Sequence, residues 1–532
     1  MSAKRPIPLA TKEHQWAASD PKLSAWVSAH AGSGKTHVLS QRVVRLLLAR
    51  VPPSRILCLT YTKAAAANMA SRIFKILAAW ALLDDRALDE AVKEASGQRL
   101  DPAKRDFARR LFARAVETPG GLKIQTIHAF CERILHLFPF EANVPAGFKV
   151  IDDIERGELL ARARETALRQ AIHPDGALFE ATAAVAREAS ETAFDGLIQE
   201  LLRHRDALQD FRDSADYERD LRRRLGLNEG ETPAGIESLM IDGGIASKDW
   251  PALAERLRQG STKDKSLADQ LAHAAGLAPD PACIEEYLLV FFTQKGAPRG
   301  GDGSMLTQGL CKKDPELLAL LEGERDRLAV LIERRKTAAA FARSIALARV
   351  GEAIIAEYER LKSRRGLFDF DDLIERTRAL LRRSSPSWVL YKLDQQIDHV
   401  LLDEAQDTSA PQWEILQAIA NEFAQEKGVR PRTFFAVGDE KQSIFSFQGA
   451  APDKFDAMRR EFESRFTSAQ LDFRQIPLKM SFRSAQTILS NVDAIFKAGD
   501  NRRGLNPDPQ EPAPDHEALK TDAPGLVEIW DA

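Results

Sequence analysis

Cysteine is scarce in this sequence of 532 residues, and its four copies lie far apart, at Cys58, Cys131, Cys283 and Cys311. This spacing excludes a disulfide scaffold and a cysteine-based zinc site, and it fits a reducing compartment. An excess of positive charge is also lacking, because 75 Lys and Arg residues face 78 Asp and Glu residues, for a formal net charge of −3. The chain therefore does not coat nucleic acid as a polycation, although its composition is compatible with a local basic groove.

Long hydrophobic runs are missing as well. The N-terminal segment has no apolar core of the kind that marks a secretion signal. No stretch approaches the roughly 18 uninterrupted apolar residues that would cross a bilayer. The sequence predicts a cytoplasmic protein without a membrane partner.

The chain does contain enough apolar material for several cores. Hydrophobic residues make up 44% of it, and its length predicts about three or four domains of ~150 residues each. Helical patterns such as Val38–Ala49 and Ala64–Ala79 alternate with short apolar runs, which favours a doubly wound α/β sheet. The runs typical of buried parallel strands are Ala25–Ala29, Ile56–Thr60, Lys123–Ile127, His399–Leu402 and Phe434–Val437.

The alternation of strands and helices is interrupted in the middle of the chain. Residues 141–365 are rich in Ala, Leu, Arg and Glu with helical periodicity, which predicts a large helical insertion. The strand pattern resumes at Asp398. Near the end, Asn501–Pro524 predicts a loop or linker, and Gly525–Trp530 predicts one more strand.

The clearest motif spans residues 29–36, Ala-His-Ala-Gly-Ser-Gly-Lys-Thr, which follows an apolar strand and opens a helix. It matches a P-loop except that Ala29 takes the place of the first glycine. Small residues let backbone N–H groups reach phosphate, and the helix N-terminus favours anions. We expect Lys35 to reach the β- and γ-phosphates and Thr36 to bind Mg²⁺; the alternative is an ordinary glycine-rich turn. The candidate nucleotide-binding residues here are Ala31, Gly32, Ser33, Gly34, Lys35, Thr36 and His37.

A second candidate cluster, Asp403 and Glu404, follows the apolar run His399–Leu402. At the end of a buried strand Asp403 could hold Mg²⁺, and Glu404 could orient and deprotonate an attacking water. The alternative is an acidic turn before a helix, because carboxylates favour helix N-termini. Together with the P-loop, the cluster predicts magnesium-dependent hydrolysis of a nucleoside triphosphate.

Five further segments stand in a fixed order along the chain. They are Thr-Lys-Glu-His-Gln at 11–15, Leu-Thr-Tyr-Thr-Lys-Ala-Ala at 59–65, Gln-Thr-Ile-His-Ala-Phe-Cys at 125–131, Val-Gly-Asp-Glu-Lys-Gln-Ser-Ile-Phe-Ser-Phe-Gln-Gly-Ala at 437–450, and Met-Ser-Phe-Arg-Ser at 480–484. With the P-loop and the Asp-Glu-Ala-Gln-Asp box at 403–407, this set resembles the superfamily 1 DNA helicases of the UvrD/PcrA/Rep/RecB type. Segments 365–373, 438–445 and 525–530 are most similar to AddA, the helicase–nuclease subunit of AddAB complexes.

The resemblance implies a fold and a division into domains. It implies a RecA-like ATP-binding domain 1A at 1–140 and 366–468, with the helical insertion at 141–365 as subdomain 1B. It also implies that residues 469–532 begin a second RecA-like domain, 2A. The family's motifs V and VI and a nuclease domain are not found in the sequence, so we expect the N-terminal portion of a longer protein.

The resemblance also implies roles for residues around ATP. Gln15 would contact the adenine edge and Phe482 would stack on the adenine. Gln442 would sense the γ-phosphate, and Arg483 would contact the same phosphate from the second RecA-like domain. Outside this context, Arg483 is equally compatible with a surface salt bridge.

Other residues of the same motifs would contact DNA. Aromatic rings would stack on successive bases of a single strand, and hydroxyl and imidazole groups would bind its backbone. Each also has a structural alternative, as a strand face, a core residue or a packing histidine. The candidate DNA-binding residues are Thr60, Tyr61, Thr62, Thr126, His128, Phe445 and Phe447.

The function that the resemblance implies is an ATP-dependent 3′–5′ DNA helicase or translocase of double-strand break repair. Its cofactors would be ATP and Mg²⁺, and its partners would be single-stranded and duplex DNA and an AddB-like subunit. Two alternatives stay open, a general UvrD-like repair helicase and an inactive fragment that binds DNA or a partner.

Overall fold

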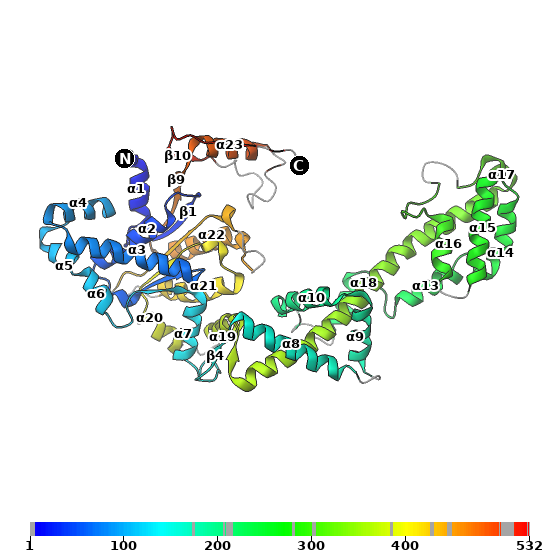
Figure 1. The fold of residues 1–532 in the computed structure, drawn as a ribbon, viewed down its shortest axis with the longest axis horizontal. Helices are drawn as coiled ribbons and strands as arrows, with labels where there is room; N and C mark the ends of the chain where they lie inside the picture. Colours follow the sequence, from blue (N-terminus) through cyan, green and yellow to red (C-terminus); the bar gives the residue numbers. More distant parts are fainter. Residues whose placement is uncertain are drawn as a thin grey trace. The chain divides into compact units, whose positions relative to one another are not determined.

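A computed structural model of the chain describes residues 6–172, 176–205, 208, 216–278, 282–300, 305–382, 387–425, 430–443, 449–498, 501, 515–528 and 530. The chain divides into two compact units. The first combines Met1–Asp152 with Gly366–Ala532, and the second is Asp153–Arg365. The chain thus leaves the first unit after Asp152 and returns to it at Gly366 (Figure 1).

A six-stranded parallel sheet forms the centre of the first unit, in the order β3-β2-β6-β7-β1-β8. Its strands are β1 (Ser24–Ala29), β2 (Ile56–Thr60), β3 (Lys123–Thr126), β6 (His399–Leu402), β7 (Thr433–Gly438) and β8 (Phe473–Leu478). The register aligns Val27 with Val437 and Thr60 with Thr126, so the strands end at one edge of the sheet. The predicted α/β class is confirmed, and the five expected strands are present within one residue of their expected bounds.

Both faces of this sheet are buried, as in a doubly wound fold. In β7, Phe434 and Ala436 belong to one hydrophobic cluster, whereas Phe435 and Val437 belong to the other. The first cluster is completed by α7 (Ile127–Leu137), α19 (Phe370–Arg382), α20 (Ser387–Asp394), α21 (Ala410–Gln425) and α22 (Pro452–Ser468). The second is completed by α1 (Leu9–Ala18), α2 (Lys35–Leu48), α3 (Lys63–Leu82), α4 (Asp85–Ser96), α5 (Arg105–Arg109) and α6 (Leu111–Glu117).

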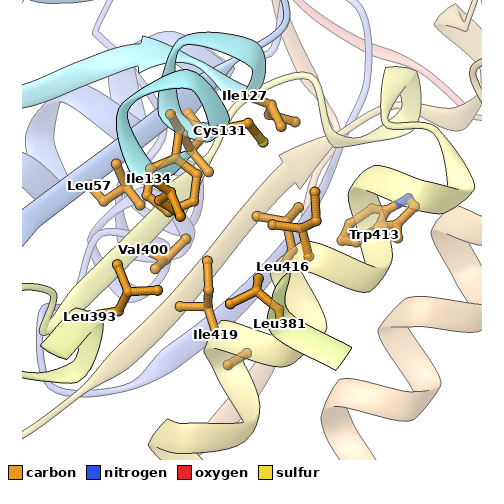
Figure 2. Close-up of a cluster of buried hydrophobic side chains, with 14 of the residues drawn as sticks. Leu57, Ile127, Cys131, Ile134, Leu381, Leu393, Val400, Trp413, Leu416 and Ile419 are labelled. Carbon is orange, nitrogen blue, oxygen red and sulfur yellow. The ribbon is translucent and has the colours of Figure 1, made fainter. Parts of the chain in front are cut away.

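Figure 2 shows part of the first cluster, where apolar side chains from α7, α19, α20 and α21 meet the sheet. Ile127 and Ile134 come from α7, Leu416 and Ile419 from α21, and Val400 projects from β6 toward them. The helices that follow β3 and β6 are therefore fixed to the sheet by close packing. This packing gives the loops at the strand ends a rigid base.

A second, two-stranded parallel sheet is formed by β9 (Met480–Ala485) and β10 (Glu517–Lys520), with α23 (Gln486–Lys497) against it. A third pair, β4 (Lys149–Val150) and β5 (Leu367–Phe368), lies where the chain leaves and re-enters the first unit. Next to β5, the acids of segment 369–372 form a reciprocal helix cap, in which the backbone N–H groups of Asp369 and Asp372 each donate to the other carboxylate.

Two expectations about the C-terminal part are wrong. Strand β8, inside the stretch 469–532 expected to begin domain 2A, instead pairs with β1 as the edge of the first sheet. Its six residues include Arg474, Gln475 and Pro477, so it lacks the apolar run that would have marked it. Residues 525–528 of the expected final strand form no strand, and β10 lies instead in the stretch expected to be a loop. Only Ala518 of β10 is buried, which leaves too short a hydrophobic pattern to detect.

The second unit is built around α18 (Pro315–Arg365), a helix of 51 residues that measures about 75 Å at the usual rise. The second unit contains its own hydrophobic cluster, in which the rings of Trp250 and Tyr287 stack at 4.1 Å. The Tyr287 hydroxyl donates to Glu324 of α18 over 2.7 Å. The other helices are α8 (Asp153–Gln170), α9 (Ala177–Glu188), α10 (Glu191–Arg203), α12 (Tyr217–Arg224), α13 (Pro233–Asp242), α14 (Trp250–Arg258), α15 (Thr262–Leu277), α16 (Cys283–Phe291) and α17 (Gln308–Lys313). None of the helices that the structure describes has the length and apolar character needed to cross a bilayer.

We expect Trp26→Ala to destabilise the first unit by about 3–5 kcal/mol, because a large buried ring is lost. Trp26 of β1 is fully buried between Trp413 and Phe455, at ring distances of 5.8 Å and 4.9 Å. The measurement is denaturant unfolding followed by circular dichroism. Trp388→Ala, at a half-exposed ring of α20, is the matched control, and equal losses in the two variants would contradict the packing described.

Candidate active site

The P-loop connects β1 to α2 and adopts a backbone that requires glycine at two positions. Gly32 has φ +73° and Gly34 has φ +93°, both in the left-handed region. The Ser33 N–H donates to the His30 carbonyl oxygen, which closes a tight turn before α2 begins at Lys35. The Ser33 hydroxyl is buried and has no hydrogen-bond partner among the described residues. A buried hydroxyl without a partner beside a helix N-terminus is suited to an anionic ligand.

A pocket of about 590 Å³ opens in front of this loop. Its size lies within the range of nucleotide and cofactor sites. The predicted residues that line it are Gln15, Gly32, Ser33, Gly34, Lys35, Thr36, His37, Glu404, Gln442, Phe482 and Arg483. Ala31 is exposed on the loop, and Asp403 is buried at the end of β6; neither lines the pocket.

Lys35 links the P-loop to two other predicted site residues, Glu404 and Gln442. Its Nζ donates to Glu404 Oε2 over 2.7 Å and to Gln442 Oε1 over 3.5 Å, although these residues lie 369 and 407 positions away. The Lys35 side chain is largely buried, so little solvent screens this ion pair. Glu404 itself has φ +48°, an uncommon conformation for a residue with a side chain.

Asp403 is a buried carboxylate that forms no direct ion pair with Lys35 or any other described residue, since the Lys35 ammonium bonds Glu404 instead. Burial, and then the adjacent charge of Glu404, raise the pKa of Asp403 to about 7. A divalent cation would remove this penalty, because it would neutralise both carboxylates. Thr36 lies in the first turn of α2 on the same pocket, and its hydroxyl is an oxygen ligand of the kind Mg²⁺ takes. Asp403 and Thr36 therefore fit a magnesium site.

Gln406 is a residue of this site that the sequence analysis did not assign. It is buried, and its Nε2 donates to Glu404 Oε2 over 3.0 Å and to Asp407 Oδ2 over 3.3 Å. Its Oε1 accepts from the N–H of Asp439 over 2.9 Å. Asp439 in turn accepts from Gln442 Nε2 over 2.7 Å, so one hydrogen-bonded chain connects the loops after β6 and β7.

The strand β9 approaches the P-loop directly. The Phe482 N–H donates to the Gly32 carbonyl oxygen over 2.9 Å, and the Phe482 ring lines the pocket. A Cβ added at Gly32 would lie 2.7 Å from Arg483 Cβ and 2.9 Å from Ser481 Oγ. Glycine is thus required at position 32 both for its φ angle and for the approach of β9.

Two other pocket residues, Ile7 and Arg72, were also not assigned from the sequence. Arg72 of α3 lies beside His37, with its Nη2 at 3.2 Å from His37 Nδ1. Burial, and then the charge of Arg72, lower the pKa of His37, which favours the neutral imidazole near pH 7. No motif marks Arg72, because only the packing of α3 beside α2 brings it to the pocket.

The described candidates for DNA contact gather at the ends of β2 and β3, which are neighbouring strands. Thr60 and Thr126 are register partners, and both are buried. The Thr60 hydroxyl donates to the Thr62 carbonyl oxygen, and the hydroxyls of Thr62 and Thr126 cap α3 and α7. In this conformation these three hydroxyls support the local backbone.

Tyr61 and His128 lie at the same edge and are partly accessible. The His128 ring packs edge-on against Phe370 at 5.5 Å, and burial lowers the pKa of His128. Burial, and then the charge of Asp407, raise the pKa of Tyr61, which places the phenol near the acidic loop after β6. The remaining candidates, Phe445 and Phe447, lie outside the described residues.

A parallel sheet with a glycine-rich loop between its β1 strand and the following helix defines a P-loop protein of the RecA-like α/β class. The family model of the UvrD/REP helicase N-terminal domain matches residues 10–463, and the chain belongs to this family.

Several curated relatives are named as the A subunit of an ATP-dependent helicase/nuclease. The protein of Moorella thermoacetica is 28% identical over 513 residues, which cover 88% of this chain and 33% of the relative. The protein of Latilactobacillus sakei is 25% identical over 92% of this chain and 55% of its own length. That of Listeria monocytogenes serotype 4a is 26% identical over 91% and 39%. The chain spans between a third and just over half of the length of these relatives, and their names agree with the AddA resemblance.

We expect Asp403→Asn to stabilise the protein in a pH-dependent way when divalent cations are removed by EDTA. The pKa of Asp403 is about 7 in the folded protein against an ordinary value of 3.8, so the ionised form is disfavoured by folding. The contribution of Asp403 to the free energy of unfolding therefore falls as the pH rises from about 4 to 7, by at most about 1.4 kcal/mol per pH unit. Above about pH 7 this contribution is constant. The melting temperature of the variant should exceed that of the wild type by a margin that grows from about pH 5 to pH 7. A margin independent of pH, or one matched by Asp472→Asn at an exposed position, would contradict this account.

We expect Gly32→Ala to weaken nucleotide binding about ten-fold, because the left-handed backbone alone costs an L-residue about 1–2 kcal/mol. The added Cβ would also meet Arg483 and Ser481 of β9. The measurement is titration with a fluorescent ADP analogue. Gly147→Ala, where an added Cβ meets no atom within 4 Å, should bind as the wild type does, and unchanged affinity in Gly32→Ala would disprove the close approach of β9.

Proposed function

We propose that this chain carries the ATP-hydrolysing motor of a 3′–5′ DNA helicase or translocase that acts in double-strand break repair. The observation that carries the proposal is the convergence on one pocket of Lys35, Glu404 and Gln442, from three distant segments of the chain. Membership in the UvrD/REP helicase family supports DNA as the track.

In the proposed complex, the adenine lies at the end of the pocket lined by Gln15, His37 and Phe482. The phosphates lie over the P-loop, where Lys35 and the backbone N–H groups at the start of α2 bind them. Thr36 and Asp403 would hold Mg²⁺, which would neutralise charge on the phosphates when bound. Arg483 of β9 lies on the same pocket and contacts the γ-phosphate from the side of the second sheet.

Lys35 and Glu404 are held together by an ion pair. When the γ-phosphate binds the Lys35 ammonium, Glu404 loses its partner and becomes the base that orients and deprotonates the attacking water. Gln406 stays bonded to the same Glu404 oxygen and limits where the carboxylate can move. Binding of the γ-phosphate to Lys35 is thus the event that frees Glu404 to act as the base.

The contacts of Gln406 and the charge of Asp407 support coupling between the nucleotide and DNA. Gln406 bonds Glu404 on one side and Asp407 on the other, and Asp407 lies near Tyr61 at the ends of β2 and β3. A shift of Glu404 on hydrolysis would pass through these groups to the proposed DNA surface. Stacking of bases on Tyr61, Phe445 and Phe447 would make this surface independent of base sequence.

The proposed biological setting comes from the relatives. Their name designates one subunit of a helicase/nuclease assembly. We extend it to this chain as a proposal: the motor acts on duplex and single-stranded DNA together with an AddB-like partner subunit.

We expect single-stranded DNA to stimulate ATP hydrolysis by the purified protein, and Lys35→Ala to reduce the stimulated kcat at least about 100-fold. Lys104→Ala, at an exposed position of the same unit, should retain the wild-type rate. The measurement is a coupled ATPase assay with and without oligonucleotide. Unchanged hydrolysis in Lys35→Ala would refute the phosphate site, and DNA binding without turnover in the wild type would favour a binding module instead.

The proposed direction of movement has its own assay. Partial duplexes with a single-stranded 3′ tail or 5′ tail are offered separately, with ATP and Mg²⁺. Any displacement is expected from the 3′-tailed substrate, and displacement only from the 5′-tailed one would reverse the proposed polarity.

A further inference from the structure

One residue of the P-loop motif, His30, has no role in the proposed chemistry. His30 is the residue between β1 and the loop glycines, where its carbonyl oxygen accepts from Ser33 and its N–H donates to the Leu478 carbonyl oxygen over 3.0 Å. Its ring Nδ1 is buried without a hydrogen-bond partner among the described residues. A movement of His30 would therefore change the turn that presents Ser33 and Lys35 to a nucleotide.

The His30 ring packs against a second histidine, which comes from the other sheet. His516 precedes β10, and the two ring centroids lie 4.5 Å apart at an angle of 55°. The carboxylate of Asp493 in α23 forms two hydrogen bonds with His516. It accepts one from the His516 backbone N–H over 3.0 Å and shares the other with His516 Nδ1 over 2.5 Å. Asp493 and most of His516 are buried, so the pair has a fixed place. We call His30, His516 and Asp493 the histidine clamp.

The clamp contacts the P-loop at a different residue from the one that β9 contacts. On the pocket side, β9 is bonded to the loop through Phe482 and Gly32. The clamp adds a second attachment from the β9–β10 sheet to the same loop, at His30. The β9–β10 sheet and the residue before it thus contact the loop at two points, Gly32 and His30.

The charges around the clamp favour ring packing of a neutral His30. Burial comes first, followed by the charges of His516, Lys441 and Lys479, and together they lower the pKa of His30 to about 4 against a smaller raising effect of Asp493. His30 is therefore uncharged at neutral pH and contributes through its ring face.

We propose that His516, held by Asp493, is a positioning residue that fixes the P-loop for nucleotide binding through its ring contact with His30. This inference rests on the proposed function in that the P-loop is taken as the nucleotide site. It assigns to the β9–β10 sheet a part in nucleotide affinity that is separate from the contacts of Phe482 and Arg483.

The first test measures nucleotide affinity and turnover separately. We expect His516→Ala to raise the Kd for a fluorescent ADP analogue about three- to ten-fold, the range of an aromatic pair contact. The kcat at saturating ATP should stay within about two-fold, because the residues around the γ-phosphate are unchanged. His516→Phe, which keeps a ring against His30, should recover most of the affinity. His273→Ala, at an exposed histidine of α15, is the matched control and should change neither quantity.

The second test needs neither nucleotide nor DNA, so that it stands even if the proposed function fails. Hydrogen–deuterium exchange of the peptide covering residues 29–36 should be faster in His516→Ala than in the wild type and His273→Ala. If His516→Ala does not fold, Asp493→Asn takes its place, because it keeps the His516 ring and weakens its support.

Unchanged exchange of this peptide in a folded variant would overturn the clamp. So would a fall of kcat and melting temperature with no change in Kd, because that pattern describes a purely structural contact. Faster exchange in a protein that binds no nucleotide would retain the clamp and reject the proposed function.

Discussion

The parallel register of β1, β6 and β7 is the constraint on which the rest of the structure depends. Because the three strands run in one direction and end at one edge, the loops that follow them meet there. The ion pair of Lys35 and Glu404 is the direct result, since each residue follows its strand closely. A shift of register would separate the ammonium from the carboxylate and leave the buried Lys35 charge unpaired.

Buried carboxylates lie close to the P-loop lysine, and their charge explains the chemistry of the site. Burial raises the pKa of Asp403, of Asp407 and of Asp439, while Lys35 forms its ion pair with the neighbouring Glu404. Burying these carboxylates close together is electrostatically costly, and a cation bound with a triphosphate would relieve this cost. The close packing of both faces of the sheet offsets the cost of holding these carboxylates together.

The P-loop is constrained from two directions, and this unites the site with the histidine clamp. The strand β1 and the helix α2 fix the two ends of the P-loop. Phe482 of β9 contacts the loop at Gly32, and His516, just before β10, contacts it at His30. A nucleotide in the pocket would therefore contact residues from both sheets at once. Such an arrangement lets changes at the nucleotide be transmitted to the second sheet through short, defined contacts.

The sequence by itself determined the parallel sheet, the P-loop and the acidic pair, because apolar runs, glycines and charged residues each carry a local signal. Local signals failed for β8 and β10, whose pairing depends on partners far along the chain. Only the tertiary structure showed that Gln406 bonds both Glu404 and Asp439, that Arg72 reaches the pocket, and that His516 packs on His30. Those contacts join residues of different elements, and their geometry follows from how helices and sheets pack, which no single segment encodes.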